Sequence, residues 1–165
     1  MKARRALVAA AAVMLAVALG LLLRQYAFGL VRVAGTSMED TLLSGDLTLA
    51  TRFDGGIQRG DVVECRFPGR ADTYVKRIIA LPGDSVAFSD GRLLLNGEAV
   101  DEPYVSSQTE DYALELGEDE YLALGDNRLD SYDSRMDDMG PVSRGDILGR
   151  IRWIIYPLGR FGPIQ

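Results

Sequence analysis

The 165-residue sequence contains no histidine and only one cysteine, Cys65. Without histidine, no imidazole is available as a general base near neutral pH. A single cysteine excludes an intramolecular disulfide, and the carboxylates lack the spacing typical of metal ligands. We therefore expect no metal site and no cofactor. Cys65 lies in an alternating apolar segment, which predicts a buried and inert strand residue.

Basic residues are in the minority: 18 Lys and Arg stand against 24 Asp and Glu, which gives a net charge of −6. Phosphate binding requires clustered basic side chains, so this charge argues against a nucleic-acid partner. The chain is long enough for one domain with a substantial core and too short for a second full domain. We expect a monomer.

The N-terminus combines a basic tail, residues 1–5, with a run of eighteen uncharged residues that ends before Arg24. As a helix this run would be roughly 27 Å long, close to the roughly 30 Å hydrocarbon core of a bilayer. It predicts a transmembrane anchor over residues 6–24, with the tail in the cytoplasm and residues 25–165 on the outer face of the cytoplasmic membrane. A removable signal peptide is the alternative, because the run is rich in alanine and Ala-Val-Ala at 16–18 resembles a cleavage site.

Beyond residue 30, short alternating segments separated by glycine- and proline-containing turns predict strands and no long helix. The expected strands cover residues 47–53, 62–67, 73–81, 86–88, 92–95 and 147–156. Strands of this number and spacing are typical of an all-β barrel or sandwich. The predicted fold class is therefore mainly β, with an N-terminal transmembrane helix followed by a compact barrel- or sandwich-like domain. We expect Trp153 in the core of this domain.

An acidic excursion, about residues 97–120, interrupts the strand pattern. Residues 101–120 contain eight carboxylates and no basic residue. A solvated loop or exposed face explains this composition better than a binding role does.

A polar segment between the apolar N-terminus and the β-rich body carries Ser37. Since the chain has no histidine, a serine nucleophile here needs another base, and a desolvated lysine is the usual substitute. Lys76 suits this role because strand alternation places it on the same face as Tyr74 and Ile78, which are suitable walls for burial. A free lysine is only about 0.1 % neutral near pH 7.5, so its pKa must fall by roughly 3 units. We therefore expect no carboxylate beside Lys76.

Three segments resemble, in order, the signature motifs of bacterial type I signal peptidases. Gly-Thr-Ser-Met at 35–38, with Thr-Leu at 41–42, resembles the segment that carries the nucleophile. Tyr-Val-Lys-Arg-Ile-Ile-Ala-Leu-Pro-Gly-Asp at 74–84 resembles the segment that carries the lysine. Gly-Asp-Asn-Arg-Leu-Asp-Ser-Tyr-Asp-Ser-Arg at 125–135 resembles the third signature, and Gly-Pro-Val at 140–142 follows it as in the family.

This resemblance implies a membrane-anchored serine endopeptidase that removes N-terminal signal peptides from exported preproteins after small residues in an Ala-x-Ala pattern. Ser37 would be the nucleophile and Lys76 its general base, which later protonates the leaving amine. Ser131 matches the serine that orients the lysine. The implied partners are signal peptides and membrane lipid, with the translocation machinery as a further candidate.

The resemblance also assigns supporting residues and a substrate pocket. Asp133 and Arg135 match an ion-paired set that braces the site, with Arg77 as a partner of that set. The pocket for small side chains would be lined by apolar and aromatic residues: Val33, Ala34, Met38, Leu42, Tyr74 and Val75.

Two positions depart from the common family pattern. Gly35 stands where many members carry a serine or threonine whose hydroxyl helps to hold the oxyanion, so the oxyanion would depend on backbone N–H groups, chiefly that of Ser37. Asp40 stands where the common pattern has a proline that would fix the turn. We expect the Asp40 side chain to point to solvent, since a negative charge nearby would oppose the fall in the pKa of Lys76.

Two other functions remain as alternatives. A self-cleaving repressor-type protease also uses a Ser/Lys pair, but such proteins are soluble and usually carry a DNA-binding helical domain, which the apolar run and the charge do not suit. A non-catalytic, membrane-anchored β-module would retain the motifs as scaffold. Its signature would be the loss of Ser37 or Lys76, and both are present.

Overall fold

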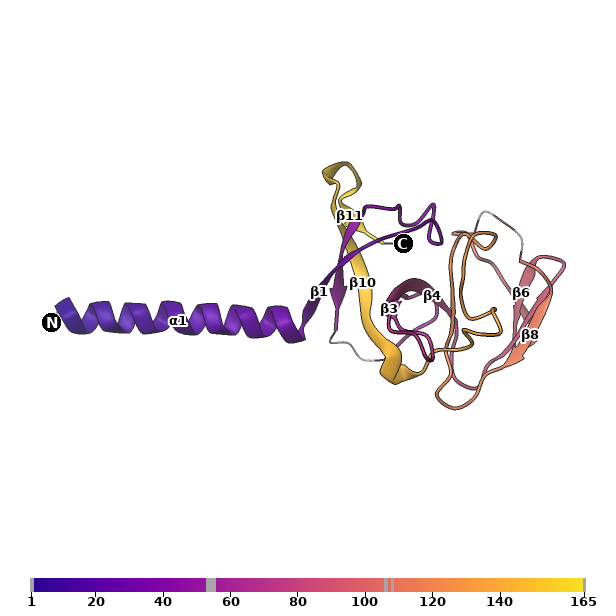
Figure 1. Ribbon diagram of the computed structural model, residues 1–165, viewed down its shortest axis with the longest axis horizontal. Coiled ribbons are helices and arrows are strands. Elements are labelled where there is room, and N and C mark those ends of the chain that lie inside the picture. The colour runs from indigo at the N-terminus through magenta and orange to yellow at the C-terminus, as the bar shows by residue number, and fades with distance from the viewer. Residues whose placement is uncertain (1, 53–55, 106, 108, 165) are drawn as a thin grey trace.

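The structure is a computed structural model and describes residues 2–52, 56–105, 107 and 109–164. A long N-terminal helix, α1 (Lys2–Tyr26), extends away from a body built of strands (Figure 1). Two short 3-10 helices, η1 (Arg144–Asp146) and η2 (Leu158–Arg160), precede and follow the longest strand.

The strands form two antiparallel sheets. The larger sheet contains β1 (Phe28–Arg32), β2 (Leu47–Thr51), β3 (Val62–Cys65), β4 (Tyr74–Ala80), β9 (Leu122–Leu124), β10 (Ile147–Tyr156) and β11 (Gly162–Pro163). Its order is β1-β2-β10-β3-β4-β9, with β11 paired to β10. The smaller sheet contains β5 (Ser85–Ser89), β6 (Arg92–Leu95), β7 (Glu98–Val100) and β8 (Tyr112–Glu115), in the order β7-β6-β5-β8. The prediction of a mainly β fold is confirmed.

All six expected strands are present, and β6 and β10 have the predicted bounds. Strands β1, β7, β8, β9 and β11 were not predicted. They contain two to five residues each, and a segment such as Leu-Ala-Leu in β9 is too short to show an alternation. Their place in a sheet comes from pairing with distant strands, which the local pattern does not record.

Strand β4 positions the site because it lies inside the larger sheet, between β3 and β9. Every side chain from Lys76 to Ala80 is buried, since both faces of the strand are covered. Ile79 belongs to an apolar cluster with residues of the smaller sheet, and Ile78 belongs to another that includes Phe67. Strand β4 is therefore a rigid support for any group that it carries.

Cys65 is fully buried at the end of β3, as expected. Burial raises the pKa of its thiol to about 12, although the nearby charge of Lys76 acts in the opposite direction. A thiol with so high a pKa is almost wholly protonated at neutral pH, and the thiolate is the reactive form. Cys65 is thus inert.

The apolar N-terminal run is helical, and the large apolar side chains described along α1 are exposed. Leu7 is 72 % exposed and Met14 is 74 % exposed, which shows that α1 does not pack on the body. In the part of the chain that the structure describes, no helix has both the length and the apolar character needed to cross a membrane. The transmembrane anchor predicted for residues 6–24 is therefore not confirmed.

The acidic excursion is largely an exposed face, as one of our two expectations held: seven of the eight carboxylates at 101–120 are exposed, and Glu102 is the exception. Strands β7 and β8 lie within it and complete the smaller sheet. Glu102 forms an ion pair of 2.6 Å with Arg128, whose side chain is only 1 % exposed. Tyr104 and Tyr112 pack against the apolar core. Carboxylates dominate the composition of the segment, but its aromatic and aliphatic residues determine its structure.

Trp153 is 40 % exposed and does not lie in the core, contrary to our expectation. It pairs with Leu49 of β2 in the sheet register, and its ring lies 5.6 Å from that of Phe161. Leu30 of β1 pairs with the same Leu49. The edge of the sheet next to α1 therefore presents an apolar, partly aromatic surface.

Candidate active site

Ser37 lies in the turn between β1 and β2, residues 33–46, which we call the nucleophile turn. Two of its backbone hydrogen bonds flank Ser37 closely: the N–H of Glu39 donates to the carbonyl of Thr36 at 3.0 Å, and the N–H of Leu42 donates to the carbonyl of Met38 at 2.7 Å. Met38 and Leu42 are buried in an apolar cluster. The turn is thus anchored by two apolar side chains that follow a half-buried Ser37.

Lys76 is 2 % exposed and pairs in register with Val63 of β3. Its ammonium nitrogen, Nζ, donates a hydrogen bond of 3.0 Å to Oγ of Ser131. The hydroxyl of Ser131 in turn donates to Oδ2 of Asp133 at 2.6 Å. Ser131 therefore links Lys76 to Asp133 through two consecutive hydrogen bonds.

Burial lowers the pKa of Lys76 below its ordinary value, because the charged form loses its hydration. The charge of Asp133 acts in the opposite direction, and that of Arg135 partly cancels it. We expected no carboxylate beside Lys76, and among the described residues none forms a hydrogen bond or ion pair with its Nζ; Asp133 lies beyond the Ser131 hydroxyl. Desolvation is nevertheless the largest effect, so the net direction is the one that a lysine base requires.

Asp133 is fully buried and paired with Arg135 at 2.8 Å. It also accepts a hydrogen bond of 3.0 Å from the backbone N–H of Gly125. Burial alone would raise the pKa of Asp133, but the hydrogen bonds and charge of Arg135, with those of Ser131 and Gly125, hold it below its usual range. The lowered pKa favours the anionic form of Asp133, which accepts the hydrogen bond of the Ser131 hydroxyl.

Arg77 has a different partner from the one predicted. Its guanidinium forms a bidentate ion pair with Asp126, at 2.9 and 2.7 Å, instead of joining Asp133 and Arg135. Thr41 of the nucleophile turn donates to the same carboxylate at 2.6 Å. The Tyr104 ring covers the guanidinium, with its centroid 3.9 Å away. The buried Arg77–Asp126 pair therefore ties the nucleophile turn to β4. The sequence pattern had assigned no role to Asp126.

Gly125 lies where the nucleophile turn and the Ser131 hydroxyl approach each other. A Cβ atom at this position would lie 2.4 Å from the carbonyl oxygen of Ser37 and 2.2 Å from Oγ of Ser131. Both contacts are far inside van der Waals distance, so only glycine fits. The sequence signal for this role was the glycine that opens the third segment, but glycines in turns are too common to identify it.

Ser37 and Lys76 open into the same cavity, which has a volume of about 200 Å³. Five of the six residues predicted for the substrate pocket line it: Val33, Ala34, Met38, Tyr74 and Val75. Leu42, the sixth, is fully buried in the core and supports Met38 from behind. Val31, Arg32 and Thr73 also line the cavity and were not predicted, because they lie outside the motifs.

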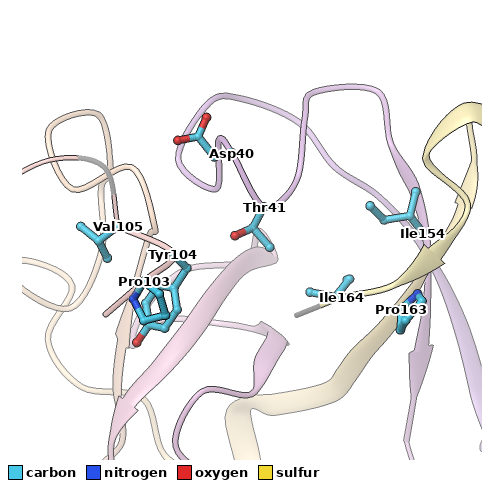
Figure 2. Close-up of a pocket in the computed structure, with 8 residues that line it drawn as sticks. All are labelled: Asp40, Thr41, Pro103, Tyr104, Val105, Ile154, Pro163 and Ile164. Atoms are coloured by element: carbon cyan, nitrogen blue, oxygen red, sulfur yellow. The ribbon is translucent and has the colours of Figure 1, made fainter. Parts of the chain in front are cut away.

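Asp40 is exposed, as expected, and its carboxylate points away from Ile154 and Ile164 across a second cavity (Figure 2). The backbone of Asp40 has a φ of 58°, in the left-handed region. Proline, whose φ is fixed near about −65°, cannot adopt this conformation. The departure at this position therefore accompanies a turn of different shape. The second cavity measures about 440 Å³ and is lined by Asp40, Thr41, Pro103, Tyr104, Val105, Ile154, Pro163 and Ile164.

Within the described ranges, no cluster of three or more Cys, Asp or Glu side chains has an arrangement that could hold a metal ion.

Comparison with known proteins identifies the class. The family profile described as signal peptidase, peptidase S26, matches residues 5–156. Signal peptidase I P of Bacillus subtilis subsp. natto is 33% identical, over 88% of this chain and 86% of that protein. Signal peptidase I U of Bacillus subtilis strain 168 is 35% identical, over 77% of this chain and 75% of that protein.

A solved structure agrees with this result. The crystal structure of a signal peptidase I from Enterococcus faecalis V583 is 30% identical, with a TM-score of 0.54, over 58% of this chain and 97% of that one. The chain belongs to the signal peptidase family, peptidase S26. It is a serine endopeptidase that cleaves signal peptides from exported preproteins. The repressor-type and non-catalytic alternatives are not favoured.

Proposed function

We propose that Ser37 is the nucleophile and Lys76 the general base of this peptidase, and that it cuts after small residues in an Ala-x-Ala pattern. The observation that carries the proposal is the state of Lys76: it is buried, its pKa is lowered, and it opens into the same cavity as Ser37. A neutral amine held in this way can accept the Ser37 proton.

The proposed reaction has two halves. Lys76 takes the proton of the Ser37 hydroxyl as its oxygen attacks the scissile carbonyl, and then gives that proton to the leaving amine, the new N-terminus of the mature protein. In the second half, Lys76 removes a proton from a water molecule as the water oxygen attacks the acyl-enzyme ester. The bond from the acyl carbon to Ser37 Oγ then breaks, Lys76 returns the proton to that oxygen, and the signal peptide leaves as a carboxylic acid. Ser131 keeps the amine in place throughout, because its own hydrogen goes to the Asp133 carboxylate.

The preference for small side chains is supported by the size and lining of the cavity. Its walls are the side chains of Val33, Ala34, Met38, Tyr74 and Val75, and its volume is about 200 Å³. This volume lies below the roughly 300–1,000 Å³ of typical ligand pockets. Alanine-sized groups at the first and third positions before the cut suit such a space, whereas large side chains do not.

Cleavage of a preprotein with an Ala-x-Ala site tests this assignment. The detergent-solubilised wild type is compared with Ser37→Ala and Lys76→Ala, and Cys65→Ala serves as a matched buried control on the adjacent strand. We expect the wild type and the control to cut, and neither site variant to do so. Equal cutting by all four proteins would refute the assignment of both residues. Replacing the alanine before the cut with leucine should abolish cleavage.

We further propose that α1 anchors the peptidase in the cytoplasmic membrane, with its basic tail inside and residues 25–165 on the outer face. The support is twofold: the apolar side chains described along α1 are exposed, and the nearby strands β1 and β10 carry exposed Phe28, Leu30 and Trp153. Alkaline extraction of membranes and digestion by external protease test this topology. Release into the alkaline supernatant, or protection from the protease, would contradict it.

A further inference from the structure

The 125–135 segment contacts the nucleophile turn through its backbone as well as through the Asp126 carboxylate. The backbone N–H of Asn127 donates to the carbonyl of Ser37 at 3.0 Å. The side-chain amide of Asn127 donates to the carbonyl of Thr36 at 3.3 Å. The Thr36 hydroxyl donates to the Asp130 carboxylate. The peptide groups that follow Thr36 and Ser37 are therefore both hydrogen-bonded to the 125–135 segment.

These contacts determine where the N–H of Ser37 points. A peptide bond is planar and trans, so the carbonyl of Thr36 and the N–H of Ser37 point in opposite directions. The carbonyl of Thr36 accepts from Asn127 and from the N–H of Glu39. Fixing this oxygen therefore fixes the N–H on the other side of the plane.

The N–H of Ser37 also has no competing partner. No group among the described residues accepts a hydrogen bond from it, whereas its neighbours Glu39 and Leu42 both donate within the turn. Gly35 offers no hydroxyl as a second donor, and its φ of 86° places it in the left-handed region, where a side chain is strained. The orientation of this one N–H consequently matters more here than in a site with a side-chain donor.

We propose that Asn127 and Asp130 are positioning residues that hold the Thr36–Ser37 peptide so that the N–H of Ser37 faces the oxyanion of the transition state. The inference rests on the proposed roles of Ser37 and Lys76. Asp130 acts through the Thr36 hydroxyl, and Asn127 acts through the Thr36 carbonyl. Neither residue touches the reacting atoms.

The experiment measures kcat, KM and the pH profile of cleavage for Thr36→Val, Asp130→Ala and Asn127→Asp. Each variant removes one contact, and Asn127→Asp places an acceptor opposite the Thr36 carbonyl. Removal of an oxyanion donor lowers kcat by about 10²–10³-fold, so loss of one positioning contact should lower it by about tenfold. KM should stay unchanged, because the substrate pocket is intact, and the midpoint of the pH profile should stay unchanged for Thr36→Val, which alters no charge near Lys76.

Conservative variants separate the hydrogen bond from other effects. Thr36→Ser and Asp130→Asn keep a donor and an acceptor, so they should recover most of the lost rate. The double variant Thr36→Val/Asp130→Ala should be no slower than either single variant, since both remove the same contact. Ser85→Ala is the matched control: it deletes an exposed hydroxyl-to-carboxylate hydrogen bond, from Ser85 to Glu115, in the smaller sheet.

The outcomes distinguish this inference from the proposed function. If Ser37→Ala and Lys76→Ala are inactive but Thr36→Val and Asp130→Ala keep the wild-type kcat, the positioning role is wrong and the dyad stands. Equal losses in Asp130→Asn and Asp130→Ala would also overturn it, because the charge would then matter instead of the hydrogen bond. Full cleavage by Ser37→Ala would refute the proposed function itself.

Discussion

Two buried cations stand next to each other on β4 and have opposite environments. Lys76 and Arg77 are each 2 % exposed. Lys76 meets a neutral hydroxyl, and burial lowers its pKa. Arg77 meets the Asp126 carboxylate in bidentate geometry and the face of Tyr104. Burial favours the neutral form of a cation that has no direct counter-charge, which suits the base role that we propose for Lys76. A buried cation with a counter-charge stays charged and supports the structure.

The side-chain chemistry matches the two environments. An ammonium group can lose its proton within the range that burial reaches, whereas a guanidinium with a pKa above about 12 stays charged. A guanidinium also presents the fork that a carboxylate requires for two parallel hydrogen bonds. The two positions should therefore not tolerate each other's residue.

The largest effect is expected from exchanging the cation at the first position. Lys76→Arg places a permanent charge where a neutral base is required, so cleavage should fall by about 10⁴-fold or more. The same exchange in reverse, Arg77→Lys, serves as the matched variant and should lower stability while most of the cleavage activity remains. Rates are measured on a preprotein substrate. Appreciable activity of Lys76→Arg would show that the base is another group.

The second prediction concerns the free energy of unfolding. Removal of one partner from a buried ion pair leaves the other uncompensated and costs about 3–5 kcal/mol. We expect this loss for Arg77→Met and for Asp126→Leu, because the wild-type side chains of Arg77 and Asp126 are only 3 % and 0 % exposed. The double variant should recover part of it. Denaturant unfolding of all four proteins gives the coupling, and strictly additive losses would show that the pair does not interact.

The comparison also marks the limit of what the sequence could predict. The segment of Lys76 and the long apolar strand β10 were predicted because both have strong local patterns. The partner of Arg77 could not be predicted, because it depends on how β4 pairs with β9. This pairing places Arg77 opposite Leu124, two residues before Asp126. Leu42 was misplaced for a similar reason: the motif shows that it is apolar, but only the packed turn shows which side faces the cavity.

The acidic excursion shows the same limit from another direction. Its eight carboxylates predicted exposure, and seven of them are exposed, but the composition did not predict that Glu102 pairs with Arg128 or that Tyr104 covers Arg77. Composition describes the average residue of a segment, whereas the contacts that order it involve few residues. Tyr104 lies 27 positions beyond Arg77 in the sequence, so no local pattern joins them.

The third prediction is the pH dependence of stability. Between the lowered pKa of folded Lys76 and its ordinary value of 10.5, the unfolded chain binds a proton that the folded chain does not. Stability from this group therefore rises with pH across that window and is lost as the pH falls through it. Lys76→Met should be more stable than the wild type at neutral pH and lack this slope. Unfolding measured from pH 6 to 10 tests it, and parallel curves for the two proteins would contradict it.

The smallest effect is expected from the carboxylate that stands one hydroxyl away from Lys76. The charge of Asp133 raises the pKa of Lys76, so its removal in Asp133→Asn should lower that pKa further. The amide oxygen of asparagine can still accept the Ser131 hydrogen bond, which keeps the lysine oriented. Arg135 loses its counter-charge, and its positive charge acts on Lys76 in the same direction. Because cleavage rises with pH as Lys76 loses its proton, the midpoint of the activity profile should move to lower pH.

The control is Asp138→Asn, which removes an exposed carboxylate of the same loop and should leave the midpoint in place. A midpoint that moves to higher pH in Asp133→Asn would mean that hydrogen bonding, and not charge, dominates the effect of Asp133 on the lysine.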